Sequence, residues 1–184
     1  IGLLGANGNG KSTLVKLLFW GIGCEPTLDT NWGTTDSKTI LEFTVDTTLY
    51  VVKRYKNSIS LKIEGSEFIN YDKITGEYSK KLAEILEFKA LLPNRSSGLM
   101  EVPPPAFYFL PFYIDQRRSW SKAWDNFENL EQYSNWRSTI VKYHVGLLSP
   151  KHFDLENDKA ENKDLKRVVE VQIDKIETTL EIVE

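Results

Sequence analysis

The sequence contains very little sulfur and no long apolar run. Its one cysteine, Cys24, excludes an internal disulfide and fits a reducing compartment, so we expect a cytoplasmic protein. No apolar stretch approaches the roughly 18 residues that a membrane-spanning helix needs, and no secretory signal is visible, so we expect no membrane contact. The net charge of −3 gives no overall basic field, so any surface for nucleic acid must be a local patch.

Residue types that often mark catalytic or metal sites are also scarce. His144 and His152 are the only histidines, and neither has a cysteine or a second histidine at ligand spacing, which argues against a zinc site. We expect His144 to be a packing or capping residue and Cys24 to be a small residue without reactive surroundings. No Ser/His/Asp set or carboxylate pair for acid–base chemistry is evident. The 184 residues are enough for one domain with its own core.

A phosphate-binding pattern lies near the start of the chain. Residues 5–12 read Gly-Ala-Asn-Gly-Asn-Gly-Lys-Ser and satisfy every fixed position of G-x-x-x-x-G-K-[ST]. The apolar residues 1–4 predict the end of a strand, and residues 13–22 predict an amphipathic helix. Because the chain starts inside this strand, and with Ile1 rather than Met, we expect further residues upstream. The strand–loop–helix order predicts a site for a nucleoside triphosphate with magnesium.

The chemistry of this site follows from the residue types in the loop. Glycines take backbone angles closed to other residues, so that consecutive amides turn inward toward an anion. We expect Lys11 to reach the β- and γ-phosphates and to stabilise charge on the transferred phosphoryl group. The Ser12 hydroxyl is expected to bind magnesium. The loop itself is expected to consist of Gly5, Asn7, Gly8, Asn9 and Gly10.

Alternating side chains in the next part of the chain predict an antiparallel sheet after a polar loop. On the second strand Lys53 and Tyr55 share one face, whereas Arg54 points away. The basic residues there, Lys53, Arg54 and Lys56, either contact nucleic-acid phosphates or belong to a plain exposed strand. The expected loop is 25–37, the strands are 39–45, 48–55 and 58–64, and the two-residue turns are 46–47 and 56–57.

The following residues predict further elements and leave several assignments open. The most apolar run predicts a buried strand that ends at Asp115-Gln116, with Pro111 marking an edge or a bulge. Arg117 and Arg118 either reach nucleotide, a partner or DNA, or lie in a solvated loop. Trp120 and Trp124 either stack on a base or a partner, or are buried. The expected elements are a helix over 77–92, a loop over 93–105, the strand over 106–114 and a helix over 127–144.

Residues 154–184 have no glycine or proline and are dense in charge. From Val169 onward the apolar residues follow steps of 4, 3, 4 and 3, which is a heptad seam. The segment is either the start of a coiled coil or an ordinary surface helix. The apolar positions are Leu165, Val169, Ile173, Ile176, Leu180 and Val183.

The order of these parts resembles the N-terminal half of an SMC-type ATPase head (structural maintenance of chromosomes), with RecN and SbcC as relatives. The resemblance rests on the Gly-x-Asn-Gly-x-Gly-Lys-Ser-Thr loop, the small antiparallel sheet, the strand ending in Gln116 and the long charged helix. It implies an α/β fold of the P-loop NTPase class, an ABC-type half-head with a small antiparallel β lobe. The half-head would occupy residues 1–153, and a coiled-coil arm would begin over 154–184.

The same resemblance implies an ATPase with ATP and Mg²⁺ as cofactors. Gln116 would be the Q-loop residue that contacts magnesium and the attacking water, and Thr13 would lie against the α-phosphate. The Walker B strand, signature loop and switch histidine of the family are not recognisable after Gln116. In the family they lie beyond the coiled coil, in the same polypeptide. Hydrolysis would further need a second head, a homodimer around two nucleotides, engaged on DNA.

A narrower resemblance rests on residues 110–116, Trp120, Trp124 and residues 136–146. These are similar to SMC-like subunits of bacterial anti-phage systems, the Lamassu group in particular. The resemblance implies a complex that detects foreign double-stranded DNA, often its ends, and releases a nuclease effector, with accessory subunits. The loop alone fits other functions equally well: an ATPase subunit of a membrane transporter, a P-loop small-molecule kinase, or a nucleotide-binding scaffold that does not hydrolyse.

Overall fold

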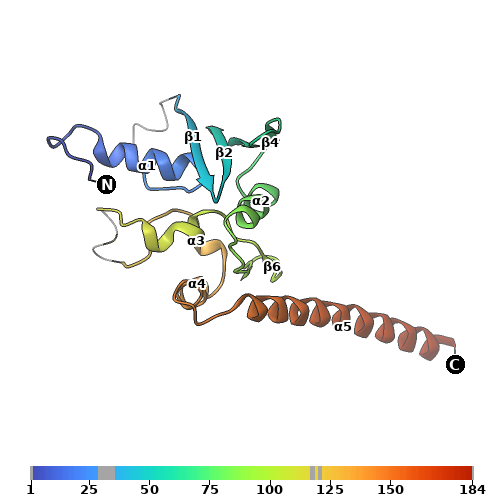
Figure 1. Ribbon diagram of the computed structural model, residues 1–184. Coiled ribbons are helices and arrows are strands. Elements are labelled where there is room, and N and C mark those ends of the chain that lie inside the picture. Colours follow the sequence, from blue (N-terminus) through green and yellow to red (C-terminus); the bar gives the residue numbers. More distant parts are fainter. Residues whose placement is uncertain (1, 29–35, 117–118, 120–121, 184) are drawn as a thin grey trace.

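The computed structural model describes residues 2–28, 36–116, 119 and 122–183, with side chains in the last helix up to residue 179 (Figure 1). The described chain is a mixed α/β structure in which the first helix lies between an antiparallel sheet and a group of short helices. The elements are α1 (Lys11–Gly21), β1 (Lys38–Val45), β2 (Thr48–Tyr55), β3 (Ser58–Ile63), β4 (Ile69–Tyr71), α2 (Glu77–Ile85), β5 (Leu92–Pro93), β6 (Met100–Glu101), α3 (Ala106–Phe109), η2 (Leu110–Phe112), η3 (Leu130–Gln132), α4 (Trp136–His144) and α5 (Pro150–Val183).

The four-stranded sheet has the order β1-β2-β3-β4 and is antiparallel throughout. The three predicted strands and both two-residue turns are confirmed, and β4 is an addition that the sequence pattern did not predict. Asp46 and Lys56 take positive φ angles of 53°, as tight hairpin turns require. The inner face of the sheet is mostly apolar, with Val52 and Leu61 paired across neighbouring strands and both buried. This face packs toward α1 and α2.

The predicted strand over residues 106–114 is wrong. Residues 106–112 form the short helices α3 and η2, and only the residues after them are extended. Three consecutive prolines start this helical segment, since a fixed φ near −65° suits the first turn of a helix, and Pro111 cannot donate to a sheet. Phe107 and Tyr108 are buried on different sides, against Trp136 and Phe88 respectively. An apolar run buried on several sides cannot be assigned to strand or helix by periodicity alone.

Two predicted helices are shorter than expected, and one predicted loop contains structure. The helix over 77–92 ends at Ile85, because Glu87 is left-handed (φ 54°) and the chain turns to bury Phe88. The helix over 127–144 is interrupted at Asn129 and Asn135, both left-handed, which leaves η3 and α4. The loop over 93–105 includes the small β5–β6 hairpin.

The strand end predicted for residues 1–4 is not observed in the described part, residues 2–4. Strands require hydrogen-bonded partners, and no described strand lies beside these residues. Leu3 is half exposed and Leu4 is 95% exposed. Two large apolar side chains before the loop are therefore left without cover by the residues that the structure describes.

Helix α5 leaves the body of the structure as a long projecting arm (Figure 1). It begins at Pro150, earlier than the predicted residue 154, and Phe153 anchors its first turns in the core. Farther along, Leu165, Ile173 and Ile176 are all exposed. The predicted seam is therefore exposed along the side chains that the structure describes. The side chains of Leu180 and Val183 fall outside this described part. Whether α5 pairs in a coiled coil stays a prediction. No helix within the described ranges has the length and apolarity to cross a bilayer.

Candidate nucleotide-binding site

The predicted phosphate-binding loop is an open turn that leads directly into α1. Gly8 and Gly10 have φ angles of 85° and 74°, in the left-handed region that glycine takes without strain. No atom lies within 4 Å of where a Cβ would stand on either residue, so the loop faces open space. Gly10 is the N-cap of α1, and its carbonyl accepts from the Leu14 amide at 2.9 Å. The loop therefore presents the amides of the first helical turn, which carry partial positive charge.

The side chain of Lys11 folds back over this loop. Its Nζ donates to the carbonyl oxygens of Gly5 and Ala6, at 2.7 Å each. Lys11 is the first residue of α1, so its ammonium group lies at the positive end of the helix. The next residues, Ser12 and Thr13, are both exposed. Positive charge, free amides and a hydroxyl are thus gathered at one point, a donor set suited to a polyphosphate with a hard cation.

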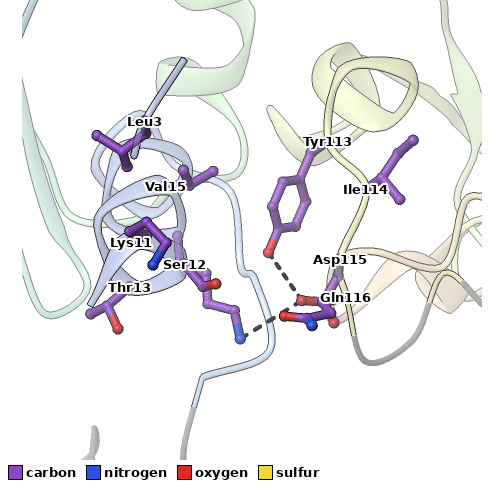
Figure 2. A pocket seen from close by; sticks show the side chains of 10 residues that line it. Leu3, Lys11, Ser12, Thr13, Val15, Tyr113, Ile114, Asp115 and Gln116 are labelled. Atoms are coloured by element: carbon purple, nitrogen blue, oxygen red, sulfur yellow. Dashed lines mark hydrogen bonds and ion pairs between the residues drawn. The ribbon is translucent and has the colours of Figure 1, made fainter. Parts of the chain in front are cut away.

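Gln116 faces the same space from the other side. A hollow of about 450 Å³ is lined by the loop from Asn7 to Thr13 and by Gln116. A second cleft, of about 400 Å³, continues from it between α1 and residues 113–116. Figure 2 shows Lys11, Ser12 and Val15 on one side of this cleft and Tyr113, Asp115 and Gln116 on the other. The structure therefore brings together the loop and the glutamine that the sequence analysis singled out from distant positions.

The segment that carries Gln116 lies along α1 through aromatic contacts. The rings of Tyr113 and Phe19 have centroids 4.7 Å apart, and Tyr113 stacks on Phe127 at 5.2 Å. Asn126, which is buried, donates from Nδ2 to the carbonyl oxygens of Tyr113 and Leu110. These contacts hold the start of the segment before it reaches the loop.

A buried ion pair at this site had no signal in the sequence. The Lys16 Nζ lies 3.8 Å from the Asp115 Oδ1, with both side chains almost fully buried. The same ammonium group donates to the Thr27 carbonyl oxygen at 2.6 Å. The Tyr113 hydroxyl donates to Asp115 Oδ1 at 3.3 Å. Burial and the neighbouring carboxylate raise the pKa of Tyr113, so its hydroxyl remains a donor.

Arg54 lies on the inner side of the sheet and belongs to the fold rather than to a binding surface. It is 2% exposed, and its guanidinium stacks over the Trp20 ring at 4.3 Å. It donates to the carbonyl oxygens of Trp20 and Cys24 at 2.6 and 3.1 Å and pairs with Glu25. The expectation that Arg54 points away from Lys53 is confirmed. Arg54 joins the C-terminal end of α1 to the sheet, as a cation at that end of the helix dipole should.

The outer face of the sheet carries lysines around two aromatic rings. The Nζ atoms of Lys38 and Lys56 lie 5.0 and 5.1 Å from the centroid of the Tyr55 ring. Those of Lys53 and Lys62 lie 3.8 and 5.7 Å from the Phe68 ring centroid. Hydrogen bonding to Tyr55 raises the pKa of Lys56, which keeps it charged. We call Lys38, Lys53, Lys56 and Lys62 the lysine face.

The remaining candidates are packing residues or fall outside the described ranges. His144 Nε2 lies 2.9 Å from the Phe107 carbonyl oxygen, and burial lowers the pKa of its imidazole. The expected packing role of His144 is confirmed, and the half-buried Trp124 ring lies beside it, at 6.0 Å. Cys24 is fully buried, which raises the pKa of its thiol. No cluster of three potential metal-binding side chains occurs among the described residues. The predictions for Arg117, Arg118 and Trp120 fall outside these residues.

Comparison with known proteins finds two similar sequences. This chain is 26% identical over 151 residues to Lamassu protein LmuB of Bacillus cereus (strain VD014). It is 27% identical over 154 residues to Lamassu protein LmuB of a Bacillus species (strain NCIM 5461 / CCTCC AB 2011126 / NIO-1130). The matches cover 80% and 82% of this chain but 26% of each relative, so the chain spans about a quarter of their length. No family model and no solved structure matches the chain.

These likenesses support the relation to Lamassu proteins that residues 110–116 and 136–146 had suggested. Each relative is much longer than this chain. The assignment to an SMC-type ATPase head therefore depends on the site itself.

Proposed function

We propose that this chain is part of an SMC-like ATPase that acts in bacterial anti-phage defence. In this proposal, ATP with Mg²⁺ binds at the loop and at Gln116, and hydrolysis accompanies the engagement of two heads on DNA. The observation that carries the proposal is the shared hollow between the phosphate-binding loop and Gln116. Two segments far apart in the sequence meet there with the groups that a nucleoside triphosphate and its cation need.

The residues present fit these cofactors. The left-handed Gly8 and Gly10 keep the loop open, and Lys11 sits at the helix N-terminus with its charge over the loop. In the proposal the amides of the loop and the Lys11 ammonium hold the phosphates, and Thr13 lies against the α-phosphate. The Ser12 hydroxyl and the Gln116 amide oxygen hold magnesium, whose charge offsets that of the phosphate oxygens when it is bound.

Hydrolysis needs further groups. No carboxylate that we can assign as a general base lies among the described residues lining the hollow, which come from 7–13 and 116. We propose that the base and the residues that close over the nucleotide come from other parts of a longer polypeptide and from a second head. The similarity to LmuB proteins, of which this chain matches about a quarter, supports such a larger protein. The exposed Leu3 and Leu4 beside the loop are suited to contact those missing parts.

For DNA we propose the lysine face of the sheet as the contact surface. The three lysines on the strands, Lys38, Lys53 and Lys62, share its outer side, and Lys56 lies in the adjoining turn. Their ammonium groups lie over the exposed Tyr55 ring and the half-buried Phe68 ring, and the one ion pair described for them is a long contact of 4.0 Å from Lys56 to Asp36. Such a local positive surface binds phosphates without regard to sequence, although the whole chain is slightly acidic. Arg54 takes no part, because it is buried.

The experiment is ATP turnover by the full-length protein with no DNA, with closed circular DNA and with linear DNA. Each assay is repeated with Lys11→Ala, which removes the ammonium group from the loop. Because the hydrogen bonds described for the half-buried Lys11 go to its own loop, we expect this variant to keep the fold. Its melting temperature serves as the control.

DNA-stimulated turnover that is lost in folded Lys11→Ala supports the proposal, and a preference for linear DNA supports the sensing of DNA ends. Turnover that is indifferent to every DNA contradicts the DNA-coupled part and favours a transporter-type or small-molecule enzyme. Turnover that persists in folded Lys11→Ala contradicts the assignment of the site.

A further inference from the structure

One face of α1 contacts both the phosphate-binding loop and the segment that carries Gln116. Ser12 and Lys16 are four residues apart and therefore lie on the same side of the helix, with Phe19 one turn farther. From the far end toward the loop, Phe19 contacts Tyr113, Lys16 pairs with Asp115, and Ser12 shares the cleft with Gln116. Residues 113–116 thus run along α1 toward the loop, and Tyr113, Asp115 and Gln116 face successive parts of the helix, whereas Ile114 is exposed.

The Lys16–Asp115 ion pair is the last described contact that joins this segment to α1 before Gln116. Lys16 is 8% exposed and Asp115 is 3% exposed, whereas Gln116 itself is exposed. Taking two charges out of water is costly, so a buried pair holds its partners in one arrangement more strictly than a surface pair does. Lys16 is in turn oriented by the Thr27 carbonyl oxygen at 2.6 Å, and Asp115 by the Tyr113 hydroxyl.

The backbone on the other side of Asp115 is also fixed. The Asp115 carbonyl oxygen accepts from the Ser119 amide at 3.1 Å. The Ser119 hydroxyl contacts Asn126, which holds the Tyr113 carbonyl. Gln116 therefore directly follows a residue that is held through both its side chain and its carbonyl oxygen.

We propose that Lys16 is a positioning residue that sets where Gln116 lies above Ser12, acting through Asp115. The inference depends on the proposed nucleotide site and assigns one of its supporting residues. Loss of the pair would leave the loop that holds the phosphates intact but would let Gln116 move away from the position of the cation. Groups that orient a metal-binding residue typically change metal affinity about 10–100-fold when they are removed.

The first test needs no nucleotide. In the full-length protein we compare Lys16→Met, which removes the charge but keeps an unbranched side chain, with Lys142→Met at an exposed position of α4. Hydrogen exchange of a peptide ending at Gln116 and covering residues 110–116 is expected to be about tenfold faster or more in Lys16→Met. It should be unchanged in Lys142→Met. Unchanged exchange in folded Lys16→Met overturns the proposal.

The second test is the affinity for a fluorescent ATP analogue with Mg²⁺ and with excess EDTA. The gain from Mg²⁺ is the increase in affinity for the analogue when Mg²⁺ replaces EDTA. Lys16→Met should reduce this gain by about tenfold and leave the affinity without Mg²⁺ nearly unchanged. Gln116→Ala should lose the same gain, and adding Lys16→Met to it should cost little more, since both act on one contact. If Lys16 has a merely structural role, Lys16→Met should instead lower the affinity equally with and without Mg²⁺, both in the wild-type protein and in Gln116→Ala. That result overturns the proposal.

Asp115→Asn tests the same pair with almost no change in volume if Lys16→Met does not fold. A full gain from Mg²⁺ in folded Asp115→Asn overturns the proposal. If the wild-type protein binds no ATP analogue in either condition, the proposed function itself fails, and this inference fails with it. Wild-type binding with an undiminished Mg²⁺ gain in the variants overturns the positioning role alone.

Discussion

Replacing Arg54 by methionine is expected to destabilise the chain strongly, because this side chain joins the end of α1 to the sheet. The guanidinium donates to the carbonyl oxygens of Trp20, Cys24 and Lys56, at 2.6, 3.1 and 3.1 Å. It also stacks on the Trp20 ring and pairs with Glu25. Methionine retains much of the apolar stem but none of the donors.

The magnitude follows from these contacts. Each buried carbonyl that loses a charged donor costs about 1–3 kcal/mol, so those of Trp20 and Cys24 together account for about 2–6 kcal/mol. The Trp20 carbonyl oxygen keeps a hydrogen bond from the Gly23 amide, so the cost at this oxygen lies at the lower end of the range for one carbonyl. Glu25 is about a third exposed, so its pairing adds only about 1 kcal/mol or less. We therefore expect a loss of about 2–5 kcal/mol in the free energy of unfolding.

Denaturant titration of the 184-residue chain, followed by tryptophan fluorescence, measures this loss. The neighbouring Lys53→Met is the matched control, because Lys53 lies on the opposite, exposed face of the same strand and should change stability by about 0.5 kcal/mol or less. Arg54→Lys should fall between the two, since lysine keeps the charge but not the fork of donors. If Arg54→Met costs no more than Lys53→Met, the structural role assigned to Arg54 is refuted.

Two further predictions concern the lysine face and the half-buried His144. The double variant Lys53→Ala, Lys62→Ala should reduce the slope of log affinity for DNA against log salt concentration by about 2. Lys142→Ala should leave this slope unchanged. An equal change of slope in the double variant and in Lys142→Ala would contradict the assigned surface. Burial lowers the pKa of His144, so below about pH 6.5 the unfolded state takes up the proton first and the free energy of unfolding falls with falling pH. His144→Leu should flatten this fall between pH 7.5 and 5.5, as measured by denaturant titration. An unchanged slope in His144→Leu would contradict the reasoning.

Local signals predicted the parts of the fold that depend on neighbouring residues. The sheet follows from alternation and two-residue turns, as at Asp46 and Lys56, and the opposite directions of Lys53 and Arg54 follow from the pleat. The helical run after Pro105 was missed because its aromatic residues are buried on several sides and carry no period. The ends of α2 and α4 depend on left-handed residues such as Glu87 and Asn135, which the hydrophobic pattern does not reveal.

The loop of the candidate site was predictable from local spacing, and Gln116 only through the family resemblance. Gly8, Gly10, Lys11 and Ser12 act within one turn of chain, so their spacing alone indicates phosphate binding. The Lys16–Asp115 pair joins distant segments through tertiary packing. No short pattern marks either residue, and only the fold shows that they meet.

Equilibrium binding of ATP with Mg²⁺ to the full-length protein tests the central claim most directly. The loop and Gln116 should bind the nucleotide in wild type. Lys11→Ala should lose most of that affinity while it keeps the wild-type melting temperature, since the hydrogen bonds described for Lys11 go to the Gly5 and Ala6 carbonyl oxygens of its own loop. Equal binding by wild type and folded Lys11→Ala, or none by wild type, would contradict the claim that this loop is a nucleotide site.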